Sequence, residues 1–196
     1  MNAAEYFAKE AEIYDKRLNS GMLGIIRNAE KKAVLNSLQP QKGEDILDVP
    51  CGTGYYADFI KKSGAEVYGI DISSEMLDVF KKKGYKGEVG SLETFSIKKK
   101  FDKILSAGGF EFCKEHKQIV RNLLSHVKDN GSVILLVTRK NVFGWMFWGY
   151  HYLLNKTSIA LFSKKEIAAV CSYEDADIIE IHPCSLFAYV VTLRKR

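Results

Sequence analysis

Two acidic residues close two short apolar runs, and a glycine-rich turn lies between them. Asp48 closes the first run and precedes a turn that contains Gly52 and Gly54, and Asp71 closes the next run. Glycine has no Cβ, so such a turn lets the backbone approach a ligand closely. An acid at the end of the second strand can accept hydrogen bonds from both hydroxyls of a ribose. The pattern therefore predicts a polar site for a ligand that contains a nucleoside.

Two classes of ligand fit this pattern. The spacing Gly52-x-Gly54-x-x-Ala57, with Asp71 after the second strand, satisfies the fingerprint of dinucleotide-binding proteins. However, the start of a helix after such a turn favours anions, and the carboxylate of Asp48 would repel a pyrophosphate there. Asp48 suits a ligand with an ammonium group and a sulfonium, which describes S-adenosylmethionine. A NAD-dependent oxidoreductase remains the weaker alternative.

The chain resembles the class I S-adenosylmethionine-dependent methyltransferases, in the small-molecule branch that includes type 11 domains. The resemblance runs from about Tyr6 to the C-terminus, and its most specific parts are Asp48-x-x-Cys51-Gly52-Thr53-Gly54 and the segment 67–77. It implies a doubly wound, mostly parallel seven-stranded α/β sheet that ends in an antiparallel hairpin. It also implies methyl transfer to a small-molecule, lipid-like or quinone-like acceptor. A non-catalytic protein that binds S-adenosylmethionine and acts through a partner remains an alternative.

Two positions depart from the pattern of the family. Pro50 stands where the family usually has its first turn glycine, and Ser91 stands where many members have an acid for the adenine amino group. Proline fixes φ and is expected only to stiffen the turn. Ser91 has no carboxylate, so the usual hydrogen bond from the adenine amino group to an acid is not expected at this position. The residues and the resemblance together predict a cofactor site formed by Asp48, Pro50, Cys51, Gly52, Gly54, Tyr55, Asp71, Ile72, Met76, Ser91, Leu92 and Ser106.

Within this site the expected roles differ. The resemblance implies that Asp48 orients the methionine part and that Asp71 holds the ribose, while Ile72 and Met76 border the adenine or belong to the core. Cys51 is expected to fill the turn as a small apolar residue, because no positioned base accompanies it.

Two residues are candidates for acid–base chemistry. The loop 106–112 follows the fourth expected strand and should lie beside the reactive centre, because ligands of open α/β sheets bind at the switch in strand order. Its Glu111 can act as a general base or bind a cationic acceptor, or it can be a surface acid. Of the four histidines, His151 has the best case because it lies among aromatic residues. No metal site is expected.

The segment 142–154 contains both tryptophans of the chain. Three interpretations compete: a lid over an apolar acceptor, core packing, and a segment that binds a membrane surface or a partner. The lid is preferred, because Gly144 and Gly149 disfavour a buried helix and can serve as hinges. The expected lid residues are Trp145, Phe147, Trp148 and Tyr152.

Periodicity and turn residues predict alternating strands and helices in one domain. Strands are expected at 45–49, 66–70, 86–90, 101–106 and 132–138, and at 177–181 and 187–193, which pair antiparallel because their link is short. Helices are expected at 3–18, 22–38, 55–62, 73–84, 115–128 and 163–171. The domain 1–196 divides into a helical cover (1–40), a cofactor-binding core (41–138), an aromatic lid (139–162) and a C-terminal helix with its hairpin (163–196).

The bulk composition excludes several other classes of protein. A net charge of +5 without a recognisable binding module argues against a nucleic-acid partner. The four cysteines form no Cys-x-x-Cys pair, so neither zinc nor a disulfide framework is expected. No apolar run reaches the roughly 20 residues that span a bilayer, and the start of the chain lacks the features of a signal peptide. A cytoplasmic protein is expected, with peripheral membrane contact as an option and no expectation for the oligomeric state.

Overall fold

The computed structural model describes residues 21–196, so the helix expected over 3–18 lies outside the described residues. Seven strands form one sheet in the order β3-β2-β1-β4-β5-β7-β6. Their bounds are β1 Asp45–Asp48, β2 Glu66–Asp71, β3 Lys86–Val89, β4 Phe101–Ala107, β5 Val127–Thr138, β6 Ala176–Pro183 and β7 Ala188–Lys195. The first five strands are parallel, and β7 pairs antiparallel with both β5 and β6. The predicted fold class is therefore confirmed.

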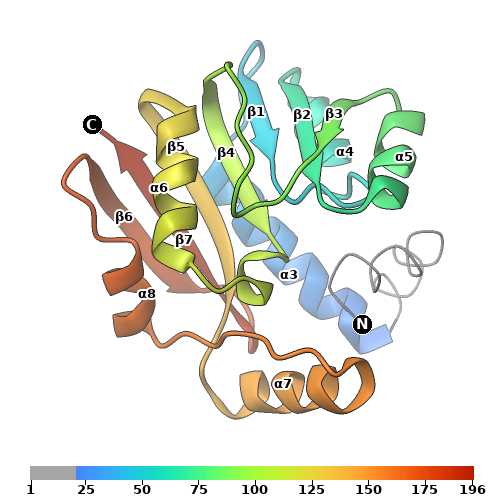
Figure 1. Cartoon of the computed structure of the whole chain (residues 1–196), viewed down its shortest axis with the longest axis vertical. Coiled ribbons are helices and arrows are strands. Elements are labelled where there is room, and N and C mark those ends of the chain that lie inside the picture. The colour runs from blue at the N-terminus through green and yellow to red at the C-terminus, as the bar shows by residue number, and fades with distance from the viewer. Residues whose placement is uncertain (1–20) are drawn as a thin grey trace.

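The order of the strands reverses at β1, which pairs with β2 on one side and with β4 on the other. Helices cover both faces of the sheet: in Figure 1, α6 lies in front of it and α3 crosses behind it. The helices are α3 Gly21–Leu38, α4 Ala57–Ile60, α5 Ser74–Lys82, α6 His116–His126, α7 Val142–Asn155 and α8 Lys164–Val170, and short 3₁₀ turns occupy Lys61–Ser63 and Phe110–Phe112.

N-cap residues that were predictable from the sequence stand at the start of two of these helices. The side chain of Ser73 accepts a hydrogen bond from the backbone N–H of Met76 and caps α5. Ser163 and Glu166 form the predicted capping box of α8, in which each side chain accepts from the backbone of the other residue.

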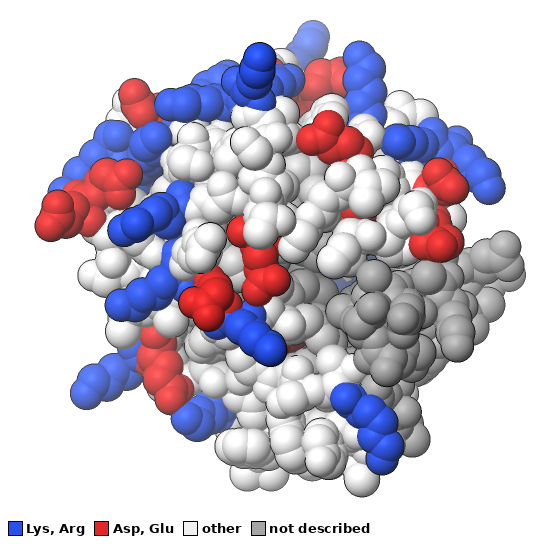
Figure 2. All heavy atoms as spheres, in the orientation of Figure 1, with Lys and Arg blue, Asp and Glu red and all other residues white. Residues whose placement is uncertain are grey.

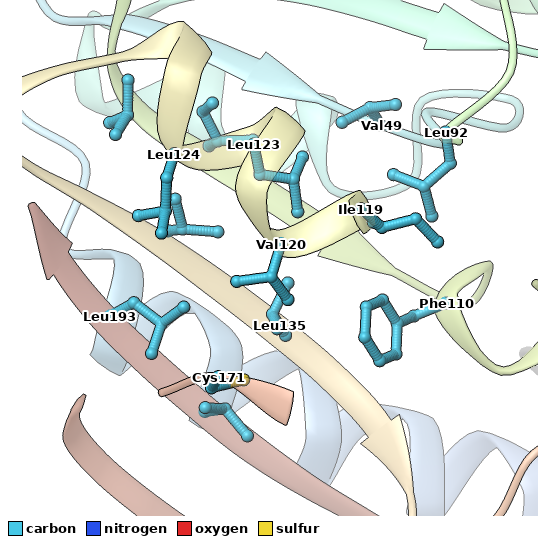
Figure 3. Packing of buried hydrophobic residues seen from close by; sticks show 14 of the residues in the cluster. Val49, Leu92, Phe110, Ile119, Val120, Leu123, Leu124, Leu135, Cys171 and Leu193 are labelled. Atoms are coloured by element: carbon cyan, nitrogen blue, oxygen red, sulfur yellow. The ribbon is translucent and has the colours of Figure 1, made fainter. Parts of the chain in front are cut away.

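The core consists of two layers because consecutive strand residues face opposite sides of the sheet. Ile46 and Leu105 pack with α3, α4 and α5, whereas their neighbours Leu47 and Ile104 pack with α6 and α8. Figure 3 shows the second layer, in which side chains of α6 meet those of β5 and β7. Both layers are apolar, as a parallel sheet buried on both faces requires.

Three elements differ from the sequence predictions. The helix expected over 55–62 is only one α-helical turn followed by a 3₁₀ turn. The strand β5 begins at residue 127 rather than 132, because an irregularity in the β4–β5 register accommodates extra residues, and Asn130 there adopts a left-handed conformation with φ of 62°.

The third difference is the aromatic segment, which the glycines do not interrupt. It forms one continuous helix, α7, and the side chain of Asn141 caps its start by accepting from the N–H of Gly144 at 2.9 Å. A Cβ at Gly144 would lie 1.8 Å from the carbonyl oxygen of Arg139, so this glycine is required by close packing at the helix start. Among the described residues, no helix combines the length and the apolar character needed to cross a membrane.

Candidate functional site

A cavity lies where β1, β2, β3 and β4 end, at the switch in strand order. It holds about 990 Å³ of empty space, with the open solvent at its mouth included. The turns after the four strands supply most of its wall, and α3 and α5 supply the rest. The lining residues are Arg27, Pro50, Cys51, Gly52, Thr53, Tyr55, Tyr56, Asp71, Ile72, Met76, Ser91, Leu92, Glu93, Ala107, Gly108, Gly109, Phe112 and Cys113.

Asp71 joins the two halves of the sequence motif. One carboxylate oxygen accepts from the N–H of Gly52 at 2.7 Å, and the other accepts from the N–H of Ser73 at 2.9 Å. Burial raises the pKa of Asp71, and these backbone hydrogen bonds lower it in part. A carboxylate offers about four lone-pair sites, so Asp71 keeps capacity for hydroxyl donors that enter the cavity.

Glycine is required in the turn before Asp71. Gly52 has φ of +52° and Gly54 has φ of +88°, which side chains rarely adopt. Gly52 lines the cavity, whereas Gly54 does not; a Cβ at Gly54 would lie 3.0 Å from the ring of Phe80. Burial raises the pKa of the Cys51 thiol strongly, which argues against a thiolate nucleophile in this turn.

Asp48 lies behind the turn rather than in the cavity wall. Its side chain is 1% exposed, and neither carboxylate oxygen has a hydrogen-bond partner within residues 21–196. Burial raises its pKa well above the ordinary value, and the charge of Asp71 raises it further. An unpartnered buried carboxylate is costly, so this position favours a cation nearby.

One side of the cavity is apolar. Met76 and Leu92 are buried in its wall, and Ile72 is about half exposed at its edge. Ser91 also lines this side, and its hydroxyl accepts a hydrogen bond from the backbone N–H of Glu93. Glu93 belongs to the cavity wall as well. The cavity therefore contains an acid two positions after the serine that replaces the acid of the family.

Another part of the wall contains residues that the sequence patterns did not indicate. Arg27 comes from α3, and its guanidinium carbon lies 3.7 Å from the ring centroid of Tyr55. Tyr56 and Phe112 complete this wall. No spacing in the sequence indicated Arg27, because α3 is brought to the cavity only by packing across the sheet.

Glu111 lies next to this wall and does not line the cavity. It is 8% exposed, and its carboxylate accepts from the hydroxyl of Thr138 at 3.4 Å. Burial raises the pKa of Glu111 to about 7, and the charge of Glu30 contributes in the same direction. The interpretation of Glu111 as a surface acid is therefore wrong, because its 3₁₀ turn directs the side chain inward.

His151 is also buried and lies outside the cavity wall. Its ring makes edge contacts with Phe112, at 5.6 Å between centroids, and with Phe147, at 4.5 Å. Phe112 thus separates His151 from the cavity and connects α7 to the cavity wall. Several other predicted site residues do not line the cavity either, and these are Ser106 and the four expected lid residues Trp145, Phe147, Trp148 and Tyr152.

Comparison with known proteins adds an independent line of argument. Residues 47–135 match the family model of a methyltransferase domain. The chain is 26% identical over 155 residues to malonyl-(acyl-carrier protein) O-methyltransferase of Priestia megaterium, covering 72% of this chain and 56% of that protein. It is 32% identical over 117 residues to a ubiquinone biosynthesis O-methyltransferase of Albidiferax ferrireducens, covering 58% of this chain and 44% of that protein. The chain thus spans about half the length of the curated relatives it matches.

The fold has close counterparts among solved structures. Magnesium protoporphyrin IX methyltransferase of Synechocystis PCC 6803 with bound SAH superimposes with a TM-score of 0.76 at 16% identity, covering 98% of each chain. At this identity the likeness concerns the fold. The matched domain and the related sequences show that this chain is similar to methyltransferases, and its fold is that of a solved S-adenosylmethionine-dependent methyltransferase structure.

Proposed function

We propose that this chain binds S-adenosylmethionine in the cavity and transfers its methyl group to a small, apolar or lipid-like acceptor. The observation that carries the proposal is the placement of Asp71. Asp71 lines the cavity and accepts a hydrogen bond from the N–H of Gly52 at 2.7 Å. A carboxylate that can accept hydrogen bonds from ribose hydroxyls therefore lies beside a glycine backbone that a ligand can approach closely. S-adenosylmethionine supplies an electrophilic methyl group when bound.

The polar groups of the cavity match the charges of this cofactor. Asp48 has unpartnered oxygens behind the turn, and an ammonium or a sulfonium bound in front of the turn would favour its ionised form. Met76 and Leu92 form an apolar surface suited to an adenine. Among the described lining residues, Arg27 has the one basic side chain, and a guanidinium is suited to bind the methionine carboxylate in bidentate fashion.

The acceptor is proposed to enter between Phe112 and α7. This side is rich in aromatic rings, because Phe147 and His151 pack behind Phe112. Transfer to an oxygen or carbon acceptor also requires removal of a proton. Glu111, with a pKa of about 7, is suited to this because a base with a pKa near the working pH is efficient. His151 is the second candidate for this base. The helix α7 covers this side of the cavity in the proposal and excludes water from it.

A calorimetric titration and a methyl-transfer assay test the proposal. Calorimetry with S-adenosylmethionine, S-adenosylhomocysteine and NAD should show binding of the first two and much weaker binding of NAD. Methyl transfer is then measured with S-adenosylmethionine labelled at the methyl group, offered with a short-chain ubiquinol analogue, a fatty acid or a free amino acid. Tighter binding of NAD would refute the cofactor assignment. Preferential methylation of the amino acid would refute the acceptor class, and binding without transfer to any acceptor would favour a non-catalytic role.

A further inference from the structure

The helix α7 exposes an apolar stripe that the rest of the described chain does not cover. Five residues define this stripe, which we call the outer face of α7: Val142, Trp145, Met146, Tyr152 and Leu153. Their spacing places them on one side of the helix. Met146 is 64% exposed and Leu153 is 69% exposed. Contiguous apolar surface of this kind marks an interaction site rather than an ordinary surface.

One side of α7 packs on the protein, and the outer face is exposed. Phe143 and Phe147 contact the ring of Phe187, and Phe147 also contacts His151. These contacts anchor α7 to the protein through its inner side. The described residues therefore leave the outer face uncovered without any rearrangement of the helix.

The charges around α7 indicate the chemistry of the partner. Residues 142–155 include no acidic or basic residue other than His151, and no acid occurs anywhere between Arg139 and Lys165. Lys156 follows α7 directly, and Lys164 and Lys165 come next along the chain at the start of α8; all three are exposed. The next acid, Glu166, is paired with Lys140 at 2.7 Å. Figure 2 shows the lower end of the molecule, where Figure 1 places α7, as largely white. An apolar stripe with tryptophan and tyrosine on a helix without acids, followed along the chain by exposed lysines, complements an anionic lipid surface.

We propose that the outer face of α7 binds an anionic membrane surface and lies in its plane. The 14 residues of α7 extend for roughly 21 Å, which is too short to cross the hydrocarbon core of about 30 Å. Trp145 and Tyr152 are suited to the level of the lipid headgroups, while Met146 and Leu153 enter the acyl boundary. This inference does not depend on methyl transfer, because it concerns a surface outside the cavity.

The position of α7 gives the surface a functional consequence. Its inner residue His151 contacts Phe112, and Phe112 lines the cavity. A membrane that covers the outer face would therefore lie within one helix diameter, about 10 Å, of the cavity wall. A lipid-like acceptor could then reach the cavity without crossing water.

Tryptophan fluorescence tests the proposal directly, because both tryptophans of the chain lie in α7. The full chain is mixed with vesicles of phosphatidylcholine, or with vesicles in which part of it is replaced by phosphatidylglycerol. We expect a blue shift and co-flotation with the phosphatidylglycerol vesicles, and weaker binding when salt is added. A wild-type protein that binds neither vesicle, or that dimerises through this face instead, would overturn the proposal.

Matched variants locate the contact. Replacing Met146→Ser and Leu153→Ser together should weaken vesicle binding on the order of a hundredfold. The control pair Ile178→Ser and Ile179→Ser, exposed on the distant edge strand β6 (Figure 1), should leave it unchanged. Gly149 lies in the same stripe, and a Cβ there meets nothing within 4 Å, so Gly149→Leu should strengthen binding. Equal effects of both serine pairs, or no gain with Gly149→Leu, would contradict the proposed contact.

The basic border is tested separately from the apolar stripe. The triple variant Lys156→Asn, Lys164→Gln and Lys165→Gln should lose most of the preference for phosphatidylglycerol vesicles. A control with the same loss of charge, Lys82→Gln, Lys98→Gln and Lys100→Gln, should retain that preference, because these exposed lysines lie outside the α7 region. An equal loss in both triples would show a general effect of net charge and would refute an oriented surface.

Discussion

Asp71 and Gly52 are joined by a hydrogen bond of 2.7 Å from the glycine N–H to the carboxylate. This bond ties the turn after β1 to the end of β2 before any ligand is present. Asp71 therefore shapes the turn as well as offering oxygens to the cavity.

Asp71→Ala is expected to reduce both stability and cofactor affinity. Hydrogen bonds to a charged group contribute about 1.5–3 kcal/mol each, so we expect S-adenosylmethionine to bind ten- to several-hundredfold more weakly by calorimetry. Ser73→Ala is the matched control, because it removes the cap of α5 at a cost of about 1 kcal/mol and leaves the cavity wall intact. Equal cofactor affinity in Asp71→Ala and the wild type would exclude a ribose role.

Gly54→Ala and Gly84→Ala form a matched pair for backbone strain. Both glycines have φ of +88°, but only Gly54 places a new Cβ near another side chain, at 3.0 Å from Phe80. Gly84→Ala should lower the free energy of unfolding by about 1–2 kcal/mol through strain alone. Gly54→Ala should lower it by roughly 1 kcal/mol more through overpacking, measured by urea denaturation. Identical losses would show that Phe80 moves aside at no cost.

Arg27→Gln is expected to weaken cofactor binding on the order of ten- to a hundredfold, because it removes a charge-assisted hydrogen bond to the methionine carboxylate. 5′-Methylthioadenosine lacks that carboxylate, so its affinity should be the same for the variant and the wild type. Calorimetry with both ligands decides the matter. If the variant binds both ligands equally poorly, Arg27 shapes the wall around Tyr55 and has no carboxylate role.

Glu111→Gln is expected to stabilise the protein at neutral and higher pH. The folded-state pKa of Glu111 is raised from an ordinary 4.5 to about 7, so the folded protein holds this proton in a range where the unfolded chain has released it. The stability of the wild type should then fall as pH rises from about 4.5 to about 7. Above this range Glu111→Gln should be more stable by at most about 3 kcal/mol, and below it the two proteins should match. Denaturation across this pH range gives the comparison.

The same variant reports on the proposed proton transfer. Because the base must be ionised, turnover of an oxygen acceptor should rise with pH through about 7 in the wild type. Glu111→Gln should lose this rise while cofactor affinity is retained. A pH profile that is unchanged in the variant would transfer the role to His151 or to no residue of the chain.

The part of the cavity formed by the glycine turn and Asp71 was predictable because its signals are local. Asp48, the turn and Asp71 lie within one strand–turn–helix–strand unit, and parallel strands bring their carboxyl ends to the same edge of the sheet. The caps Ser73 and Ser163 were predictable for the same reason, since each bonds a backbone group three residues away. Such contacts depend on spacing in the chain, and the parallel sheet with helices on both faces follows from the alternation of elements.

The side of the cavity proposed for the acceptor was decided by tertiary packing alone. Arg27, proposed to bind the cofactor, likewise reaches the cavity only because α3 crosses behind the sheet. Glu111 became buried because η2, Phe110–Phe112, turns its side chain toward Thr138. The aromatic composition of 142–154 was plain in the sequence, but it could not reveal which residues face Phe187 and which remain exposed. That division depends on where α7 docks, and docking joins residues far apart in the chain whose distances no local pattern encodes.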